Sequence, residues 1–264
     1  MKRIVSFVAL LTFLLLCGCS LQTGGMPSDF TAILHAGGSK DGLTYLNATE
    51  PFYEYYAAGY RYFEYDLMLS SDGRIIGAHE DVYFSAAELR ALGYEQFKEL
   101  RLPGGYTPVN EEWLIETVMS YPDVKIVVDA KMPTLSEDAA VLCRIEELGR
   151  LYGIDLSANI IPEVFGAEMW DILKESTSFD GYFYSQYKVY YTVDMILDHF
   201  GDDGRIIGIC FPDYVDGDIR AGFSRLKEAG KKIFIFTCEN EDEADYIKRI
   251  GADGAYVDDP SVLE

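Results

Sequence analysis

Residues 125–187 read KIVVDAKMPTLSEDAAVLCRIEELGRLYGIDLSANIIPEVFGAEMWDILKESTSFDGYFYSQY, and in them short apolar runs alternate with helical patterns. The runs Lys125–Lys131, Asn159–Phe165 and Gly181–Tyr187 are rich in aliphatic and aromatic residues, which is typical of buried strands. Between the first two, Ser136–Tyr152 places its apolar residues three or four positions apart, as an amphipathic helix does. The stretch therefore predicts consecutive strand–helix–strand units.

The same alternation extends over the rest of the chain. Five further runs have the composition of strands: Ala32–Ala36, Tyr60–Leu67, Arg205–Phe211, Lys232–Cys238 and Gly254–Val257. Further helical patterns are Ala167–Glu175, Thr192–Phe200, Asp216–Ala229 and Glu241–Ile250. Such alternation indicates parallel strands with right-handed crossovers, and eight units in roughly 235 residues suit a (β/α)₈ TIM barrel. A doubly wound open sheet is the structural alternative, although no glycine-rich phosphate loop follows the first run.

We expect one barrel domain over residues 30–264. Hydrophobic residues make up 49% of the chain, which is enough for a sizeable core. The segment Arg74–Pro122 is longer than one crossover requires, and it contains an additional β-like run, Arg74–Ala78. We interpret this segment as an excursion at one end of the barrel, not as a separate domain.

The N-terminus has the features of a bacterial lipoprotein leader. Lys2 and Arg3 precede the apolar run Ile4–Leu16, which is short for a membrane span and right for a signal peptide. Leu16-Cys17-Gly18-Cys19 then resembles a lipobox. We expect a signal peptide over 1–18, lipidation of Cys19 and a tether over 19–29, which would anchor the protein on the outer side of a membrane in the cell envelope. An ordinary signal peptide with a chance cysteine is the alternative.

Charge limits the partners of the protein. The chain has 44 acidic and 22 basic residues, so its formal net charge is −22. This balance argues against binding to nucleic acid and to anionic lipid surfaces, and leaves the lipid anchor as the route to a membrane. Beyond Cys19, the cysteines Cys143, Cys210 and Cys238 have neither a disulfide framework nor metal-like spacing. The sequence gives no indication of the oligomeric state.

Three acidic residues are predicted at the ends of two strands. Glu64 and Asp66 share one face of the second run because strand side chains alternate, and Asp129 ends the third run. Carboxylates that converge in a barrel mouth repel one another, and a bound cation removes that repulsion. Oxygen ligands favour Mg²⁺ or Ca²⁺ over Zn²⁺. A solvated cluster of charges is the alternative.

Two of the three histidines follow β-like runs. His35 ends the first run, and His79 ends Arg74–Ala78. Because active sites of TIM barrels lie at the carboxyl ends of the strands, both are candidates for a catalytic role. His199 lies near the end of a predicted helix, where its charge would favour the helix terminus.

These residues together resemble the glycerophosphodiester phosphodiesterase family, which has His-Arg-Gly, an asparagine motif, Glu-x-Asp, an Asp-Gly turn, a second histidine, Glu-x-Lys and Thr-Asp-x-Pro in this order. The matching segments here are His35-Ala36-Gly37, Asn47, Glu64-x-Asp66, Ser71-Asp72-Gly73, Ala78-His79, Asp129-Ala130-Lys131 and Val257-Asp258-Asp259-Pro260. The family fold is a (β/α)₈ barrel, as the element count independently predicts.

The resemblance implies a role for each matched residue. His35 and His79 would be the catalytic acid/base pair, although the sequence does not say which is acid and which is base. Glu64, Asp66 and Asp129 would bind the divalent cation. The positions of Lys131 and Asn47 are those that contact or orient the phosphate. The implied activity is metal-dependent hydrolysis of small phosphodiesters, glycerophosphodiesters or related lipid head groups.

The chain also departs from the family pattern. Ala36 replaces the arginine, Leu46 replaces an acidic residue, and Asp129 is one methylene shorter than glutamate, so the substrate identity stays open. Lys188 is a candidate to replace the missing guanidinium. Two other functions would each explain part of the sequence. A glycoside hydrolase would explain acidic pairs and aromatic residues but not the histidines, and a non-catalytic binding lipoprotein would explain Ala36.

Two features allow more than one interpretation. Tyr182-Phe183-Tyr184 and the tyrosine-rich stretch 187–191 either line a pocket for an alcohol group or pack in the core. Glu163 either points into the barrel mouth or lies at a helix entry.

Overall fold

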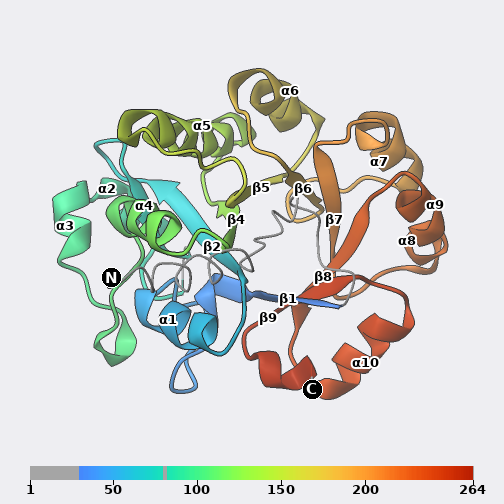
Figure 1. Ribbon diagram of the computed structural model, residues 1–264, viewed down its shortest axis with the longest axis horizontal. Helices are drawn as coiled ribbons and strands as arrows, with labels where there is room; N and C mark the ends of the chain where they lie inside the picture. The colour runs from blue at the N-terminus through green and yellow to red at the C-terminus, as the bar shows by residue number, and fades with distance from the viewer. Residues whose placement is uncertain (1–29, 80–81, 264) are drawn as a thin grey trace, which may run out of the picture.

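The computed structural model describes residues 30–79 and 82–263, which form a barrel of eight parallel strands surrounded by helices (Figure 1). The barrel strands are β1 (Thr31–Leu34), β2 (Tyr62–Leu69), β4 (Lys125–Ala130), β5 (Ile160–Val164), β6 (Tyr182–Ser185), β7 (Ile206–Pro212), β8 (Lys232–Cys238) and β9 (Gly254–Val257). β1 pairs in parallel with both β9 and β2, so the sheet closes on itself. The predicted TIM barrel is confirmed, and the open sheet is excluded.

All eight predicted strands are found within a few residues of their expected bounds. The helices that follow them are α1 (Thr49–Ala57), α4 (Glu111–Ser120), α5 (Leu135–Tyr152), α6 (Ala167–Ser176), α7 (Val193–Phe200), α8 (Gly217–Ala221), α9 (Phe223–Glu228) and α10 (Glu241–Arg249). Several begin at a side-chain cap, for example at Thr134, Thr192, Asp216 and Asn240, each of which accepts a backbone N–H of its first turn.

One predicted helix is divided. Residues 216–229 were expected to form a single helix, but the structure breaks it into α8 and α9 at Gly222. A Cβ atom at this position would lie 2.5 Å from a methyl carbon of Val193, so only glycine allows so close an approach to α7. The close packing on α7 therefore requires glycine at the point where α8 and α9 meet.

The interior of the barrel is filled by one side chain from each strand. These eight residues are Ile33, Tyr62, Val127, Ile161, Phe183, Cys210, Phe234 and Tyr256. Because strand side chains alternate, the residue two positions further along each strand also faces inward, one layer closer to the mouth. That next layer contains His35, Glu64, Asp129, Glu163, Ser185, Phe236 and Asp258. The polar site is therefore built directly on top of the apolar interior.

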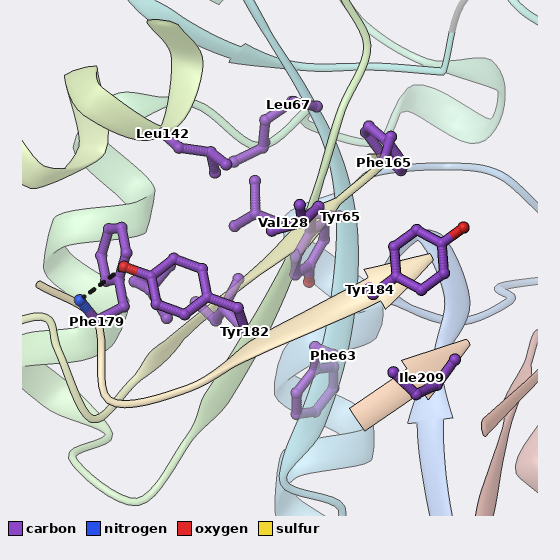
Figure 2. Packing of buried hydrophobic residues seen from close by; sticks show 14 of the residues in the cluster. Phe63, Tyr65, Leu67, Val128, Leu142, Phe165, Phe179, Tyr182, Tyr184 and Ile209 are labelled. Carbon is purple, nitrogen blue, oxygen red and sulfur yellow. Dashed lines mark hydrogen bonds between the residues drawn. The ribbon is translucent and has the colours of Figure 1, made fainter. Parts of the chain in front are cut away.

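The outward-facing side chains of the same strands pack under the helices. Phe63, Tyr65 and Leu67 of β2, with Val128 of β4, belong to the large core between the sheet and the helical ring (Figure 2). Tyr182 and Tyr184 point into this core, and the Tyr182 hydroxyl accepts the Phe179 N–H at 3.2 Å. Phe183 fills the barrel interior. Tyr182-Phe183-Tyr184 therefore packs in the core and does not line a pocket for an alcohol group.

The excursion after β2 folds back on the barrel. β3 (Ile75–Gly77) pairs antiparallel with β2, and α2 (Ala86–Ala91) and α3 (Tyr94–Lys98) follow it. Met68, Ile76 and Ala78 form a small separate core with Leu89, Tyr94 and Phe97. This arrangement agrees with an excursion at one end of the barrel.

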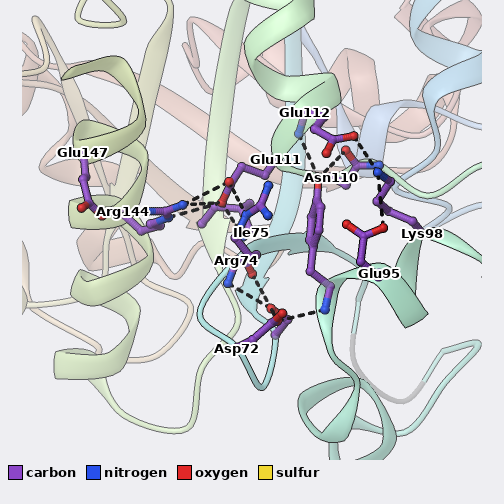
Figure 3. Close-up of polar contacts among 12 residues, drawn as sticks. Asp72, Arg74, Ile75, Glu95, Lys98, Asn110, Glu111, Glu112, Arg144 and Glu147 are labelled. Atoms are coloured by element: carbon purple, nitrogen blue, oxygen red, sulfur yellow. Dashed lines mark hydrogen bonds and ion pairs between the residues drawn. The ribbon is translucent and has the colours of Figure 1, made fainter. Parts of the chain in front are cut away.

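A buried carboxylate holds the excursion to the barrel wall (Figure 3). Glu111, at the start of α4 and 2% exposed, accepts hydrogen bonds from the Arg74 and Arg144 side chains and from the Ile75 N–H. Arg74 lies beside β3 and Arg144 on α5, so this one side chain joins three elements. Such a charge is stable when buried because its oxygens are fully paired.

The predicted signal peptide, the lipidation site Cys19 and the tether lie outside the described residues. Within residues 30–79 and 82–263, no helix is long and apolar enough to cross a membrane.

Candidate active site

Three carboxylates meet at the mouth of the barrel. Glu64 and Asp66 come from β2 and Asp129 from β4, and one oxygen of each lies within 4.8 Å of the others. Oxygen ligands lie 2.0–2.6 Å from Mg²⁺ or Ca²⁺, so ligands of one ion are at most about 5 Å apart. The three residues predicted to bind a cation are therefore placed together with a suitable spacing.

Two oxygens of this group have no hydrogen-bond partner among the described residues. Glu64 Oε1 and Asp129 Oδ1 are both buried and unpaired. A buried carboxylate oxygen without a partner is costly, and a cation at this place would satisfy both atoms. The donor set thus fits a hard divalent cation better than it fits a solvated cluster of charges.

The electrostatics of the group point the same way. Burial, together with the charges of Asp66 and Asp129, raises the pKa of Glu64 well above its ordinary value. Burial would also raise the pKa of Asp66, but the nearby Lys131, His79 and His35 and a hydrogen bond from Asn47 hold it below its usual range. The raised pKa of Glu64 reflects burial and repulsion within the group, both of which a bound cation would offset.

Asn47 fixes the position of Asp66. The Asn47 amide donates to Asp66 Oδ2 at 2.7 Å, and its oxygen accepts the Asp66 N–H at 2.8 Å. Its backbone adopts a left-handed conformation with φ of 49°, held by a hydrogen bond from its N–H to the Ala36 carbonyl. The residue is completely buried and does not line the cavity. Asn47 therefore orients a carboxylate of the candidate cation site, and any contact with phosphate would be indirect.

Lys131 brings a positively charged side chain to the three carboxylates. Its ammonium group donates to Asp129 Oδ2 at 2.6 Å and lies 3.3 Å from Asp66 Oδ1. Burial would lower the pKa of Lys131, but Asp129 and Asp66 outweigh it and raise the pKa well above the usual value. The side chain lines the cavity in its charged form, next to the carboxylates.

His35 is oriented by an acidic residue that was not among the predicted site residues. Asp258, just after β9, accepts a hydrogen bond from His35 Nδ1 at 2.8 Å. This contact leaves Nε2 facing the site, 4.0 Å from Glu64 Oε2. The Ala36 N–H donates to the same Glu64 oxygen at 2.8 Å, so the chain after β1 contacts the carboxylate group directly.

His79 reaches the site by a different route from that of His35. It follows β3, which is not a barrel strand but returns antiparallel along β2, with Gly77 opposite Leu67 and Ala78 N–H bonded to the Asp66 carbonyl. The hairpin therefore carries His79 back to the level of the carboxylates. The expectation that His79 serves the site is compatible with this placement, but the reason lies in the hairpin and not in a barrel-strand end.

Tyr45 lies between the two histidines. Its ring is nearly perpendicular to both, with centroids 4.6 Å from His35 and 5.1 Å from His79. Its backbone is also left-handed, with φ of 55°, which is uncommon for a bulky residue. Tyr45 therefore fixes the separation of the two rings, and nothing in its sequence context predicts this.

One cavity contains these groups. Its described lining consists of His35, Tyr45, Glu64, His79, Asp129, Lys131, Glu163, Ser185, Tyr187, Phe236, Thr237 and Tyr256. Glu163 thus points into the mouth, which settles the open interpretation, and from the tyrosine-rich stretch Tyr187 reaches the cavity. Burial and the charge of Asp129 raise the pKa of Glu163 to about 8.

Lys188 does not take the place of the missing arginine. Its ammonium group donates to Asp138 Oδ2 at 2.7 Å and to the Ala130 carbonyl at 3.1 Å, and the residue is not part of the cavity lining. Ala36 itself is completely buried. Of the described lining residues, Lys131 is the one lysine or arginine.

Comparison with known proteins identifies the family. Residues 35–262 match the model of the glycerophosphoryl diester phosphodiesterase family. The chain belongs to this family, and it is accordingly an enzyme of the phosphoric diester hydrolase class, as its motifs predict. No curated protein matches the chain.

Solved structures with the same fold are distant in sequence. A Galdieria sulphuraria protein assigned as a glycerophosphodiester phosphodiesterase has a TM-score of 0.71 and 18% identity, covering 89% of this chain and 96% of its own. A Silicibacter pomeroyi protein with a similar assignment has a TM-score of 0.70 and 15% identity over 90% and 93% of the two chains. An Oleispira antarctica phosphodiesterase, solved with the product sn-glycerol-3-phosphate, has a TM-score of 0.67 and 18% identity, covering 88% of this chain and 94% of its own.

Proposed function

We propose that the protein hydrolyses glycerophosphodiesters or related head-group phosphodiesters with a divalent cation and with His35 and His79 as acid and base. The observation that carries the proposal is that both histidines, Lys131 and the carboxylates Glu64 and Asp129 line one cavity. Family membership supports phosphodiester chemistry over glycoside hydrolysis and over a purely binding role.

The residues divide the reaction between them. Held by Glu64, Asp66 and Asp129, a divalent cation would neutralise the charge of the phosphate. Lys131 stabilises negative charge that builds on the non-bridging oxygens. One histidine accepts the proton of the attacking hydroxyl as its oxygen bonds to phosphorus. The other donates a proton to the departing alkoxide as its P–O bond breaks.

The purified domain tests the proposal directly. We expect it to hydrolyse glycerophosphocholine and 4-nitrophenyl phosphodiesters, to lose this activity in EDTA and to regain it with Mg²⁺ or Ca²⁺. Activity that is insensitive to EDTA would remove the metal from the mechanism, and activity on glycosides alone would overturn the proposal.

Asp258 should act as a positioning residue for His35. Asp258→Asn should lower kcat by about 10- to 100-fold with little change in KM, because the amide can stabilise the wrong imidazole tautomer. The ¹⁵N chemical shifts of the His35 ring should show the altered tautomer. Asp259→Asn, at the exposed neighbour, is the matched control and should leave both kcat and the shifts unchanged. Unchanged kcat in Asp258→Asn would contradict this role.

We also propose that the mature protein is anchored through Cys19 on the outer side of a membrane. The support comes from the sequence, in which Lys2 and Arg3, the apolar run and Leu16-Cys17-Gly18-Cys19 follow in the order of a lipoprotein leader.

Replacement of Cys19 tests the anchor. Cys19→Ala should abolish incorporation of labelled fatty acid and leave the precursor uncleaved at this site, since the lipidated thiol is gone. Metabolic labelling and the mass of the purified chain measure both effects, with Cys17→Ala as the control that keeps the acceptor. Unchanged labelling of Cys19→Ala would contradict the proposal.

A further inference from the structure

Glu163 is a buried acid that the mechanism does not use. It is 3% exposed, lines the cavity and is not part of the group of three carboxylates. Three other buried acids have Lys or Arg neighbours: Asp66 has Lys131, Asp138 has Lys188, and Glu111 has Arg74 and Arg144. The fourth, Glu64, belongs to the group of three carboxylates and lies 4.0 Å from His35 Nε2. Among the described residues Glu163 makes no such ion pair. Burying a carboxyl group without a cationic partner lowers the stability of the fold, and a ligand in the cavity that Glu163 could bind would account for its presence.

Hydroxyl groups hold the Glu163 side chain in place. The Tyr256 hydroxyl donates to Glu163 Oε1, and the Ser185 side chain also hydrogen-bonds to the carboxyl group. The Tyr256 hydroxyl also lies 3.3 Å from Cys210 Sγ, a contact that helps to fix the phenol ring. A carboxyl group offers about four lone-pair positions. Tyr256 and Ser185 use two of them, and because Glu163 lines the cavity, its other hydrogen-bonding positions are available to a ligand there.

The surroundings favour a hydroxyl-bearing partner over a cationic one. An ammonium group is bound best over free aromatic faces. The Lys131 ammonium already lies over the Tyr187 ring, 4.2 Å from its centroid, and Tyr256 directs its hydroxyl at Glu163. Phe236 is edge-on to both rings and supplies an apolar wall for C–H groups.

We propose that Glu163 binds the hydroxyl groups of the alcohol esterified to the phosphate, so that the enzyme selects phosphodiesters of polyols. The inference rests on the proposed phosphodiesterase activity. The hydrogen-bonding positions that Tyr256 and Ser185 leave free on Glu163 suit the hydroxyl groups of a polyol, and Phe236 in the same cavity suits its C–H groups. Glu163 would then determine specificity while the histidines and the carboxylate group perform the chemistry.

Three chromogenic esters with the same leaving group test this selection. They are the 4-nitrophenyl esters of glycerol 3-phosphate, propyl phosphate and phosphocholine. The readout is the ratio of kcat/KM for the glycerol ester to that for the propyl ester, in the wild type and in Glu163→Met, which keeps the volume but not the hydrogen bonds. Any direct participation of a substrate hydroxyl in the chemistry is common to both proteins and cancels when the two ratios are compared.

We expect Glu163→Met to lower this ratio by about 10- to 100-fold, the scale of one or two hydrogen bonds to a carboxyl group. Glu163→Gln should lower it less, because the amide retains an acceptor. Tyr256→Phe should lower it in the same direction by freeing the carboxyl group. Glu168→Met, at an exposed position of α6, is the matched control and should leave the ratio unchanged. Melting temperatures establish that each variant is folded.

The outcomes separate the inference from the function on which it rests. An equal loss for the glycerol and propyl esters in Glu163→Met and Glu163→Gln would overturn the specificity role alone. A selective loss for the phosphocholine ester would show that Glu163 binds a cation instead. A wild-type protein that hydrolyses none of the three esters would overturn the proposed activity and the inference with it.

Discussion

Alanine in place of either His35 or His79 should lower turnover by about 10²- to 10⁴-fold, the usual scale for loss of a general acid or base. Both rings line the cavity that also contains Lys131 and the carboxylates, and Tyr45 keeps them apart. The fold should survive, because neither side chain belongs to an apolar core. Steady-state kinetics with glycerophosphocholine, together with the melting temperature of each variant, measure both effects.

The leaving group distinguishes the two roles. A 4-nitrophenyl ester departs without protonation, so it should restore activity to the variant that lacks the acid but not to the variant that lacks the base. The two losses should not multiply in the double variant, since both residues serve one proton-transfer sequence.

His199 supplies the control for this pair. It lies in the last turn of α7 with its ring centroid 5.0 Å from that of Tyr191 and is not part of the cavity lining. His199→Ala should leave turnover nearly unchanged. Full activity in either His35→Ala or His79→Ala would remove acid–base catalysis by this pair.

The sequence predicted the barrel because its signal is repeated. In each strand–helix unit the spacing of the apolar residues changes from that of a strand to that of a helix. Because this change recurs eight times, an error of one or two residues at any one boundary does not alter the predicted fold. The division at Gly222 was not predicted, because a glycine inside a helical pattern does not by itself say whether the helix ends there. Helices α1 to α4 were not predicted individually, since they are short or surround irregular segments.

The candidate site residues that could be predicted are those whose position follows from the alternation of side chains along a strand. Glu64 and Asp129 follow interior residues of β2 and β4 by two positions, and the same rule applied to β5 and β9 would have selected Glu163 and Asp258. Tyr45 escapes such a rule, because it lies in a loop whose left-handed backbone is set by tertiary contacts. Lys188 was a candidate substitute for the arginine by charge alone, but its proximity to Asp138 depends on how the segment after β6 meets the first turn of α5.

Removing one of the three acidic ligands should have opposite effects on stability and on activity. In Glu64→Gln the amide oxygen can still accept the Ala36 N–H, while the amide nitrogen replaces the unpaired Oε1. Without added cation, the variant should melt at the same temperature as the wild type or higher, because one of three mutually repelling charges is gone. Its hydrolytic activity should fall by about 100-fold or more, because a ligand for the cation is lost.

Cation binding to the wild-type protein should itself be visible as stabilisation. A cation at about 100 times its dissociation constant stabilises the folded state by about 2.7 kcal/mol, which corresponds to a rise in melting temperature of about 5–11 °C for a domain of this size. Titration of the chelator-treated protein with Mg²⁺ and, separately, with Ca²⁺ measures this rise and indicates which cation is preferred. Glu64→Gln should lose most of the rise, whereas Glu116→Gln, at an exposed position of α4, should keep it.

The stability measurement is independent of the reaction, and so it tests the site even if the substrate differs from the one proposed. The same rise in Glu64→Gln as in the wild type would place the cation elsewhere. A wild-type protein that responds to neither cation would leave the unpaired oxygens of Glu64 and Asp129 without this explanation. Higher stability of the metal-free variant, combined with loss of cation binding and of activity, is the pattern expected when repulsion is retained for function. Burial and like charge make the three carboxylates unfavourable in the empty barrel, and the same two features make them strong ligands once a cation is bound.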